Sequence, residues 1–362
     1  MTVAPDDIKA AVGAGILTEA QAARLQGLSD SRRGARENLT PGDEPFELFK
    51  GFNEIFIVVG LAILTAGWAG VVGFSVTSEI SNIQNSAVLY GGIGAVILWA
   101  LSEYFIRRRR MVAPAIALSV LFAGNAAFAL TAYFAQPFMV AQEDYSSLPL
   151  PYAIGTLCLV VYWWRFRVPF AMAMIAVGLF TVAVLIAATQ SGTPESPADL
   201  FLLSADGPFA LITLALGAAV FAVAMAFDMS DPHRVTRRSA NGFWLHVVAA
   251  PALVNTIALT LLSRETAAAN TALVGILALF AIVAIIIDRR SFLLAAIGYS
   301  VAIAFTVFDG EGGAATILIL GIALLALGAF WDRIRAVFLA ALAPVLPLNR
   351  LPPSSLKGVV HD

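Results

Sequence analysis

The residues whose types and spacing could do chemistry inside an apolar part of the chain are His246, Pro251 and Asn255. Proline has no N–H, so Pro251 leaves the carbonyl of Val247 without its helical partner and predicts a kink. Broken helices with polar groups at mid-membrane depth are how many transporters build their binding sites. The run therefore predicts a substrate or cavity site.

The same run also has a structural interpretation, which we favour on sequence grounds. A neighbouring helix can repair the carbonyl of Val247, and Asn255 can hydrogen-bond across a helix bundle for about 0.6–2 kcal/mol. Asn125 lies near the middle of another apolar run and is a candidate partner under either interpretation. The candidate cavity residues are thus Asn125, His246, Pro251 and Asn255.

Other ionisable residues lie only at the ends of apolar runs, where they can pair with nearby arginines or reach water. We assign them structural roles; they are Glu54, Glu103, Asp228, Asp288 and Asp332.

The sequence offers little to an enzyme. It contains no HExxH, GxSxG or phosphate-loop motif, and its three histidines are widely separated. The single cysteine, Cys158, excludes an intrachain disulfide and a multi-cysteine metal site. We predict no catalytic residue, no metal, no cofactor and no nucleic-acid partner, so an enzyme would need an unfamiliar site.

The composition indicates the environment of the segments that carry these residues. Apolar residues make up 59% of the chain and the mean hydropathy is +0.85, whereas an ordinary soluble domain is about 45–50% apolar. Charged residues amount to 13% and cluster between the apolar runs. A lipid bilayer is therefore the solvent and partner that this composition predicts.

About ten apolar segments approach the roughly 20 residues that a membrane-spanning helix needs. The fold class predicted is all-α, a polytopic membrane helix bundle of about ten spans with a small N-terminal helical hairpin. The segments are residues 55–76, 85–105, 111–134, 148–164, 168–189, 208–227, 243–262, 271–287, 292–308 and 314–331. The fourth is the weakest, because it is short and begins with Pro149 and Pro151.

Four consecutive arginines, Arg107, Arg108, Arg109 and Arg110, set the orientation, because basic residues concentrate on the cytoplasmic side. With ten spans and both termini cytoplasmic, Arg264 is the only one of the 22 lysines and arginines that falls outside. The run is also a candidate site for anionic lipid headgroups, at about 1 kcal/mol per basic residue.

The first residues predict two short helices, Asp6–Ala14 and Thr18–Leu28, with Gly15 in the turn. Thr18 and Gln21 have the spacing of a capping box. So short a pair is marginal alone, and we expect a protein partner to dock on it. The apolar residues predicted to pack together are Ile8, Val12, Ile16, Leu17, Ala22, Leu25 and Leu28.

We divide the chain into an N-terminal cytoplasmic helical hairpin (residues 1–28), a linker (29–54), a ten-helix membrane domain (55–335) and an interfacial helix with a disordered tail from Pro352 (336–362). A brief interfacial helix is predicted near Pro197. The glycines of the first two spans are expected to allow close helix packing; they are Gly67, Gly70, Gly73, Gly91, Gly92 and Gly94.

Three stretches together resemble an uncharacterised family of bacterial multi-pass membrane proteins, a domain of unknown function. They are Gly15–Thr18 with Gln21 and Ala22, Phe52–Phe56, and Asp288–Leu293. Members pair a short N-terminal cytoplasmic helical segment with a bundle of about ten spans. The resemblance implies a bacterial inner (cytoplasmic) membrane and supplies no substrate or site residue.

Two functions remain open, and the oligomeric state is unknown. The first is a transporter-like role for a small solute or ion, which predicts a hydrated cavity reaching Asn125 or Asn255. The second is a membrane scaffold or envelope-sensing protein that acts through the N-terminal segment. An enzyme acting on lipid or polyprenyl substrates is the least supported.

Overall fold

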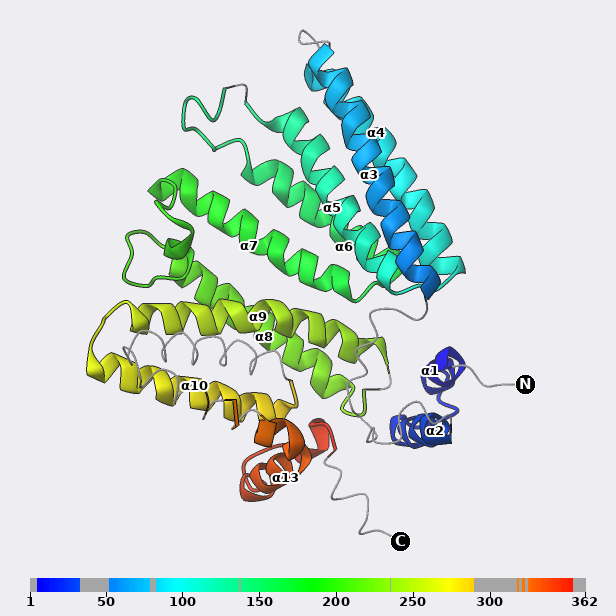
Figure 1. The fold of residues 1–362 in the computed structure, drawn as a ribbon, viewed down its shortest axis with the longest axis vertical. Helices are drawn as coiled ribbons and strands as arrows, with labels where there is room; N and C mark the ends of the chain where they lie inside the picture. Colours follow the sequence, from blue (N-terminus) through cyan, green and yellow to red (C-terminus); the bar gives the residue numbers. More distant parts are fainter. Residues whose placement is uncertain are drawn as a thin grey trace. The chain divides into compact units, whose positions relative to one another are not determined.

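The structure is a computed structural model that describes residues 5–32, 52–78, 83–136, 138–234, 236–289, 318, 321–322 and 325–353. Over these ranges the regular structure is helical, and no strand occurs in them (Figure 1). The chain divides into two compact units. Unit 1 comprises Met1–Glu44, Ala198–Asp206 and Thr213–Asp362, and unit 2 comprises Pro45–Pro197 and Gly207–Ile212.

Unit 2 is a set of long helices in which neighbours along the sequence pack together. Its elements are α3 (Phe52–Ser78), α4 (Ile83–Ser102), the π-helix η2 (Glu103–Arg108), α5 (Ala113–Phe134), α6 (Pro149–Phe166) and α7 (Phe170–Ser191). The helix α5 contacts α3, α4, α6 and α7. It is therefore the central helix of this unit.

Unit 1 contains three long helices and several short ones. Its elements are α1 (Pro5–Gly13), α2 (Glu19–Arg32), η3 (Pro197–Leu200, which starts at the boundary of the unit), most of α8 (Phe209–Ser230), α9 (Arg237–Leu262), α10 (Ala267–Ile287), α13 (Trp331–Ala341) and η4 (Leu348–Arg350). The core lies between α9 and α10, where Val254 packs with Leu273 and Leu277, and Phe221 and Met225 of α8 pack against it.

Seven of the described helices are long and apolar enough to cross a membrane: α3, α4 with η2, α5, α7, α8, α9 and α10. The apolar character and the helical fold class are thus confirmed, and the chain has the helices of a multi-pass membrane protein. The predicted span at 292–308 lies outside the described residues, as do residues 314–317, 319–320 and 323–324 of the span at 314–331. The weak fourth segment forms α6, which is not among the seven because prolines, tryptophans and Arg165 make its ends polar.

An aromatic cluster fills the interior of unit 2. The side chain of Tyr162 is fully buried, and its hydroxyl shares a hydrogen bond of 2.8 Å with the hydroxyl of Ser102. The ring of Tyr162 stacks on Phe122 with centroids 4.8 Å apart and contacts Phe166 at 4.6 Å. These contacts join α4, α5 and α6, and they satisfy the one polar atom that the buried tyrosine brings with it.

Glu54 is buried although it is charged, and it binds the first turn of another helix. Its carboxylate accepts hydrogen bonds from the backbone N–H of Val112 at 3.3 Å and of Ala113 at 3.1 Å. A carboxylate at a helix N-terminus satisfies donors that have no partner within the helix. Glu54 therefore has a structural role, as predicted. Its partner is the N-terminus of α5 and not an arginine.

The prediction that glycines allow close helix packing is confirmed at two positions. A Cβ atom on Gly91 would overlap Ala129, and one on Gly94 would overlap the side chain of Asn125, so both glycines allow α4 to approach α5. Gly67, Gly70, Gly73 and Gly92 have no described side chain within 4 Å. Among the described residues, these four glycines therefore have no close helix neighbour.

The first two helices have the predicted capping box, in which the backbone N–H of Gln21 donates to Thr18 Oγ1 at 3.2 Å and Thr18 N–H donates to Gln21 Oε1 at 3.0 Å. Gly15 has φ of 72°, the left-handed conformation that glycine adopts without strain. Ile8, Ala22 and Ala23 are buried together. The predicted packing is wrong for Ile16, Leu25 and Leu28, which are exposed.

The C-terminal segment is bound over part of its length. The Arg335 guanidinium donates to the carbonyls of Pro352 at 2.6 Å and Pro353 at 3.2 Å. The prediction of a disordered tail is thus wrong for these two residues, because a buried guanidinium needs acceptors and the backbone supplies them. Residues 354–362 lie outside the described part of the chain.

The packing of α4 against α5 can be tested with two adjacent glycines. We expect Gly91→Val to separate the two helices and to lower the stability of the purified chain by about 1–3 kcal/mol, the usual cost of overpacking. Gly92→Val adds the same side chain where the space is open, so the melting temperature in detergent should stay close to that of the wild type. Equal melting temperatures for the two variants would contradict this packing.

Candidate functional site

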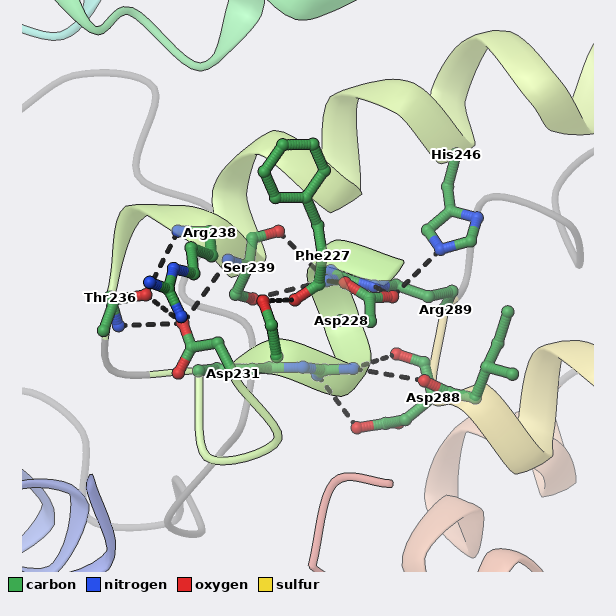
Figure 2. A network of polar contacts seen from close by, with 12 residues as sticks. Phe227, Asp228, Asp231, Thr236, Arg238, Ser239, His246, Asp288 and Arg289 are labelled. Atoms are coloured by element: carbon green, nitrogen blue, oxygen red, sulfur yellow. Dashed lines mark hydrogen bonds and ion pairs between the residues drawn. The ribbon is translucent and has the colours of Figure 1, made fainter. Parts of the chain in front are cut away.

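A network of charged and polar side chains lies where α8, α9 and α10 end or begin (Figure 2). At its centre is Asp228, in the last turn of α8, whose carboxylate faces both His246 and Arg289. The His246 Nε2 atom lies 2.9 Å from Asp228 Oδ2, and Arg289 Nε donates to the same oxygen at 2.9 Å. Arg289 Nη2 donates to the other carboxylate oxygen, which makes the pair bidentate.

All three side chains are shielded from solvent. The exposed fraction is 0% for His246, 1% for Arg289 and 6% for Asp228. A buried guanidinium stays charged, and leaving it without an anion in this environment would be costly. Asp228 is therefore held as the carboxylate partner of Arg289.

A glycine allows α9 to come close enough for these contacts. Gly242 lies one turn before His246 on α9, and a Cβ atom on it would overlap the carboxylate of Asp228. The carbonyl of Ala224 would also lie only 3.2 Å from that atom. Any side chain at this position would push the carboxylate away from Arg289.

The end of α10 directs Arg289 into the network. Asp288 ends the helix with φ of 57° and ψ of 47°, a left-handed conformation that reverses the chain. The backbone N–H of Arg289 then donates back to the carbonyl of Ala284 at 2.9 Å. Arg289 Nη2 also donates to the carbonyl of Ser239 at 3.0 Å, so the arginine contacts α9 as well as α8.

A second carboxylate fixes the turn between α8 and α9. Asp231 Oδ2 accepts from the backbone N–H of Thr236 at 2.9 Å and from its hydroxyl at 2.7 Å. Thr236 in turn caps α9, because its hydroxyl oxygen accepts from the backbone N–H of Arg238 at 3.2 Å. The helix α9 consequently begins at Arg237, six residues before the predicted start of the seventh apolar segment.

A second ion pair ties the end of α10 to its neighbours. Arg234 Nη1 donates to Asp288 Oδ2 at 2.9 Å, and Trp331 Nε1 of α13 donates to Asp288 Oδ1 at 2.7 Å. Arg335 also lies on α13. Burial lowers the pKa of its guanidinium, and the nearby Asp288 carboxylate raises it. The helix α13 is thus attached to α10 through hydrogen bonds as well as apolar contacts.

Arginine and aspartate side chains form most of this network. Arg234, Arg289 and Arg335 face Asp228, Asp231 and Asp288 in and around the network. His246 contacts the Asp228 carboxylate, and an imidazole and a carboxylate can exchange a proton. Over the described residues, no group of three histidine, cysteine, aspartate or glutamate side chains is placed to hold a metal ion.

Three of the predicted cavity residues lie in unit 1, spread along α9. His246 joins the network, whereas Pro251 is exposed and Asn255 is partly buried further along α9. Asn255 is nine residues beyond His246, which corresponds to about 13 Å of helix. Asn125 belongs to unit 2, where its amide donates to the carbonyl of Gly91 at 2.8 Å. The proposed pairing of Asn125 with Asn255 stays a prediction.

The pairing of end-of-helix carboxylates with arginines is confirmed for three residues. Asp228 pairs with Arg289, Asp288 with Arg234, and Glu103 with both Arg107 and Arg165. What the sequence analysis missed is the contact between His246 and Asp228. The capping threonine indicates where α9 begins but not which face of the helix carries His246, so the sequence held no signal for this contact.

Comparison with known proteins adds no family assignment: no family model, no curated protein and no solved structure matches this chain. The function must therefore be argued from the geometry of the chain itself.

Removing the carboxylate of Asp228 tests the network. Asp228→Asn leaves the buried charge of Arg289 without an anion, and breaking a buried ion pair in this way costs about 3–5 kcal/mol. We expect a large fall in the melting temperature of the detergent-solubilised chain. The control is Glu265→Gln, which removes an exposed carboxylate of the same unit. A fall no larger than that of the control would show that the ion pair does not stabilise the fold.

Proposed function

We propose that this chain is an integral membrane protein with a transporter-like role for a small solute or an ion. The observation that carries the proposal is the cluster of Asp228, His246 and Arg289, which joins three apolar helices that are each long enough to cross a membrane. Ionisable groups at such positions are expensive, and in membrane proteins they commonly mark proton relays and ion pathways.

The properties of α9 support this role. It is the most enclosed of the seven candidate spans, with half of its most apolar window buried, against 6% for α3. The same helix carries His246, Pro251 and Asn255, so a helix with a proline in its interior passes through the centre of unit 1. A pathway along α9 would reach the protonatable pair of His246 and Asp228.

We further propose that the chain lies in a bacterial inner membrane with both termini in the cytoplasm. The support is the distribution of basic residues along the sequence, since the arginines of the network and of η2 all fall in segments assigned to one side. In this orientation the network faces the cytoplasmic boundary of the membrane.

The transport role is tested by asking whether water reaches α9. In a Cys158→Ala background, Asn255→Cys should react with a water-soluble thiosulfonate, because only the thiolate reacts and it forms in water. Leu279→Cys is the matched control, since Leu279 is an exposed apolar residue of α10 and would face lipid. If both positions are equally unreactive in the reconstituted protein, the bundle is dry and the transport proposal fails.

A second candidate function is a scaffold or sensor that acts through α1 and α2. The observation that favours it is the exposure of Ile16 (75%), Leu28 (57%) and Leu25 (43%) on a helix pair with a very small core. Large exposed apolar side chains on so small an element are typical of a docking surface.

The scaffold function predicts the effect of a deletion. Removing residues 1–45 should abolish crosslinking to a membrane or cytoplasmic partner and leave insertion of the remaining chain unchanged, because the candidate spans begin at Phe52. An unchanged crosslinking pattern would contradict this candidate. A variant with Ile16→Ser and Leu28→Ser provides a check that keeps the chain at full length.

A further inference from the structure

The helix α4 and its continuation η2 carry two open hollows that the proposed transport role does not use. The first is an apolar furrow of about 470 Å³. It is lined by Val88, Leu89, Gly92, Ile93, Val96 and Ile97. Gly92 has no described side chain within 4 Å, so the absence of a side chain there leaves room in the furrow.

The second hollow, of about 490 Å³, follows directly along the helix and is basic. It is lined by Ala100, Glu103, Tyr104, Arg107 and Arg108. Glu103 is the carboxylate residue that lines this hollow, and two guanidinium groups share it: Arg107 at 3.2 Å and Arg165 at 2.7 Å. Arg108 is exposed and pairs with no carboxylate of the described residues, so the hollow retains a net positive charge.

The backbone at this hollow departs from the α-helix. Residues Glu103–Arg108 form a π-helix, a conformation that is rare and frequently found at functional sites. Its wider turn places Arg109 against Tyr104, where Nε and Nη2 donate to the phenol oxygen at 3.2 and 3.1 Å. The partner of Arg109 is thus uncharged, which adds another uncompensated positive charge beside the hollow.

The two hollows lie along one face of the helix. Leu89, Ile93, Val96, Ala100 and Tyr104 follow one another at spacings of three or four residues, the repeat of a single helical face. The rise from Val88 to Ile97, the ends of the furrow, is about 14 Å, which is close to half of the roughly 30 Å hydrocarbon thickness of a bilayer. A furrow of this length matches the depth of one leaflet.

We propose that this face of α4 binds one anionic phospholipid, with an acyl chain in the furrow and the headgroup phosphate in the basic hollow. Charge complementarity selects an anionic headgroup. The apolar furrow that continues from the hollow selects a lipid over a soluble phosphate, because only a lipid fills both. The hollow lies where the apolar residues of a candidate span give way to arginines, the depth at which headgroups lie.

Native mass spectrometry of the full chain tests this binding, with dioleoylphosphatidylglycerol and dioleoylphosphatidylcholine as the probes. We expect tighter binding of the anionic lipid, and Arg108→Gln should weaken it about fivefold, as expected for one basic residue at a membrane surface. Gly92→Leu should weaken the binding of both lipids, because the new side chain fills the furrow. Both positions are exposed, and unchanged melting temperatures will show that the variants fold.

The matched control is Arg333→Gln, which removes an exposed arginine of α13 and should leave the binding unchanged. Equal affinities for the two lipids, or an equal loss in the control, would overturn the proposal in favour of diffuse attraction to the basic surface. Displacement of the anionic lipid by millimolar inorganic phosphate would overturn it in favour of a soluble anion. Unchanged lipid binding by Gly92→Leu would overturn the assignment of the furrow to an acyl chain.

Discussion

The burial of a full positive charge at Arg289 is the constraint on which the rest of unit 1 depends. With 1% of its surface exposed, this guanidinium has little water to solvate it, so protein groups must replace that water. Asp228 supplies the opposite charge and Ser239 a carbonyl. Because these two acceptors lie on α8 and α9, the arginine fixes both helices against the end of α10.

Several local features follow from this requirement. Gly242 is needed because a side chain there would occupy the space of the Asp228 carboxylate, and the left-handed conformation of Asp288 is needed to turn Arg289 toward it. Replacing the ion pair by apolar residues is often neutral for stability in other proteins. Here the ion pair also positions a carboxylate that His246 contacts.

The two units solve the problem of buried polar groups in different ways. Unit 2 has an aromatic interior, in which Tyr162, Asn125 and Glu54 each have a separate partner: a hydroxyl, a carbonyl and a helix N-terminus, respectively. Unit 1 instead connects its polar groups in one network across several helix ends. Its contacts hold the ends of α8 and α9 and the residue that follows α10 together.

The sequence by itself determined the helical class and the approximate limits of the long apolar helices that the structure describes, because apolar runs and their polar ends are local properties of the chain. It also placed Asp228, Asp288 and Glu103 beside arginines, since charges at membrane boundaries must pair or reach water. Only the tertiary structure decided which arginine meets which carboxylate, that Glu54 caps a helix instead, and that His246 contacts Asp228 and lies apart from Asn255. Those choices depend on the rotation of each helix about its axis and on the close approach permitted at Gly242 and Gly91, which arise from packing between helices and leave no periodic signal in the sequence.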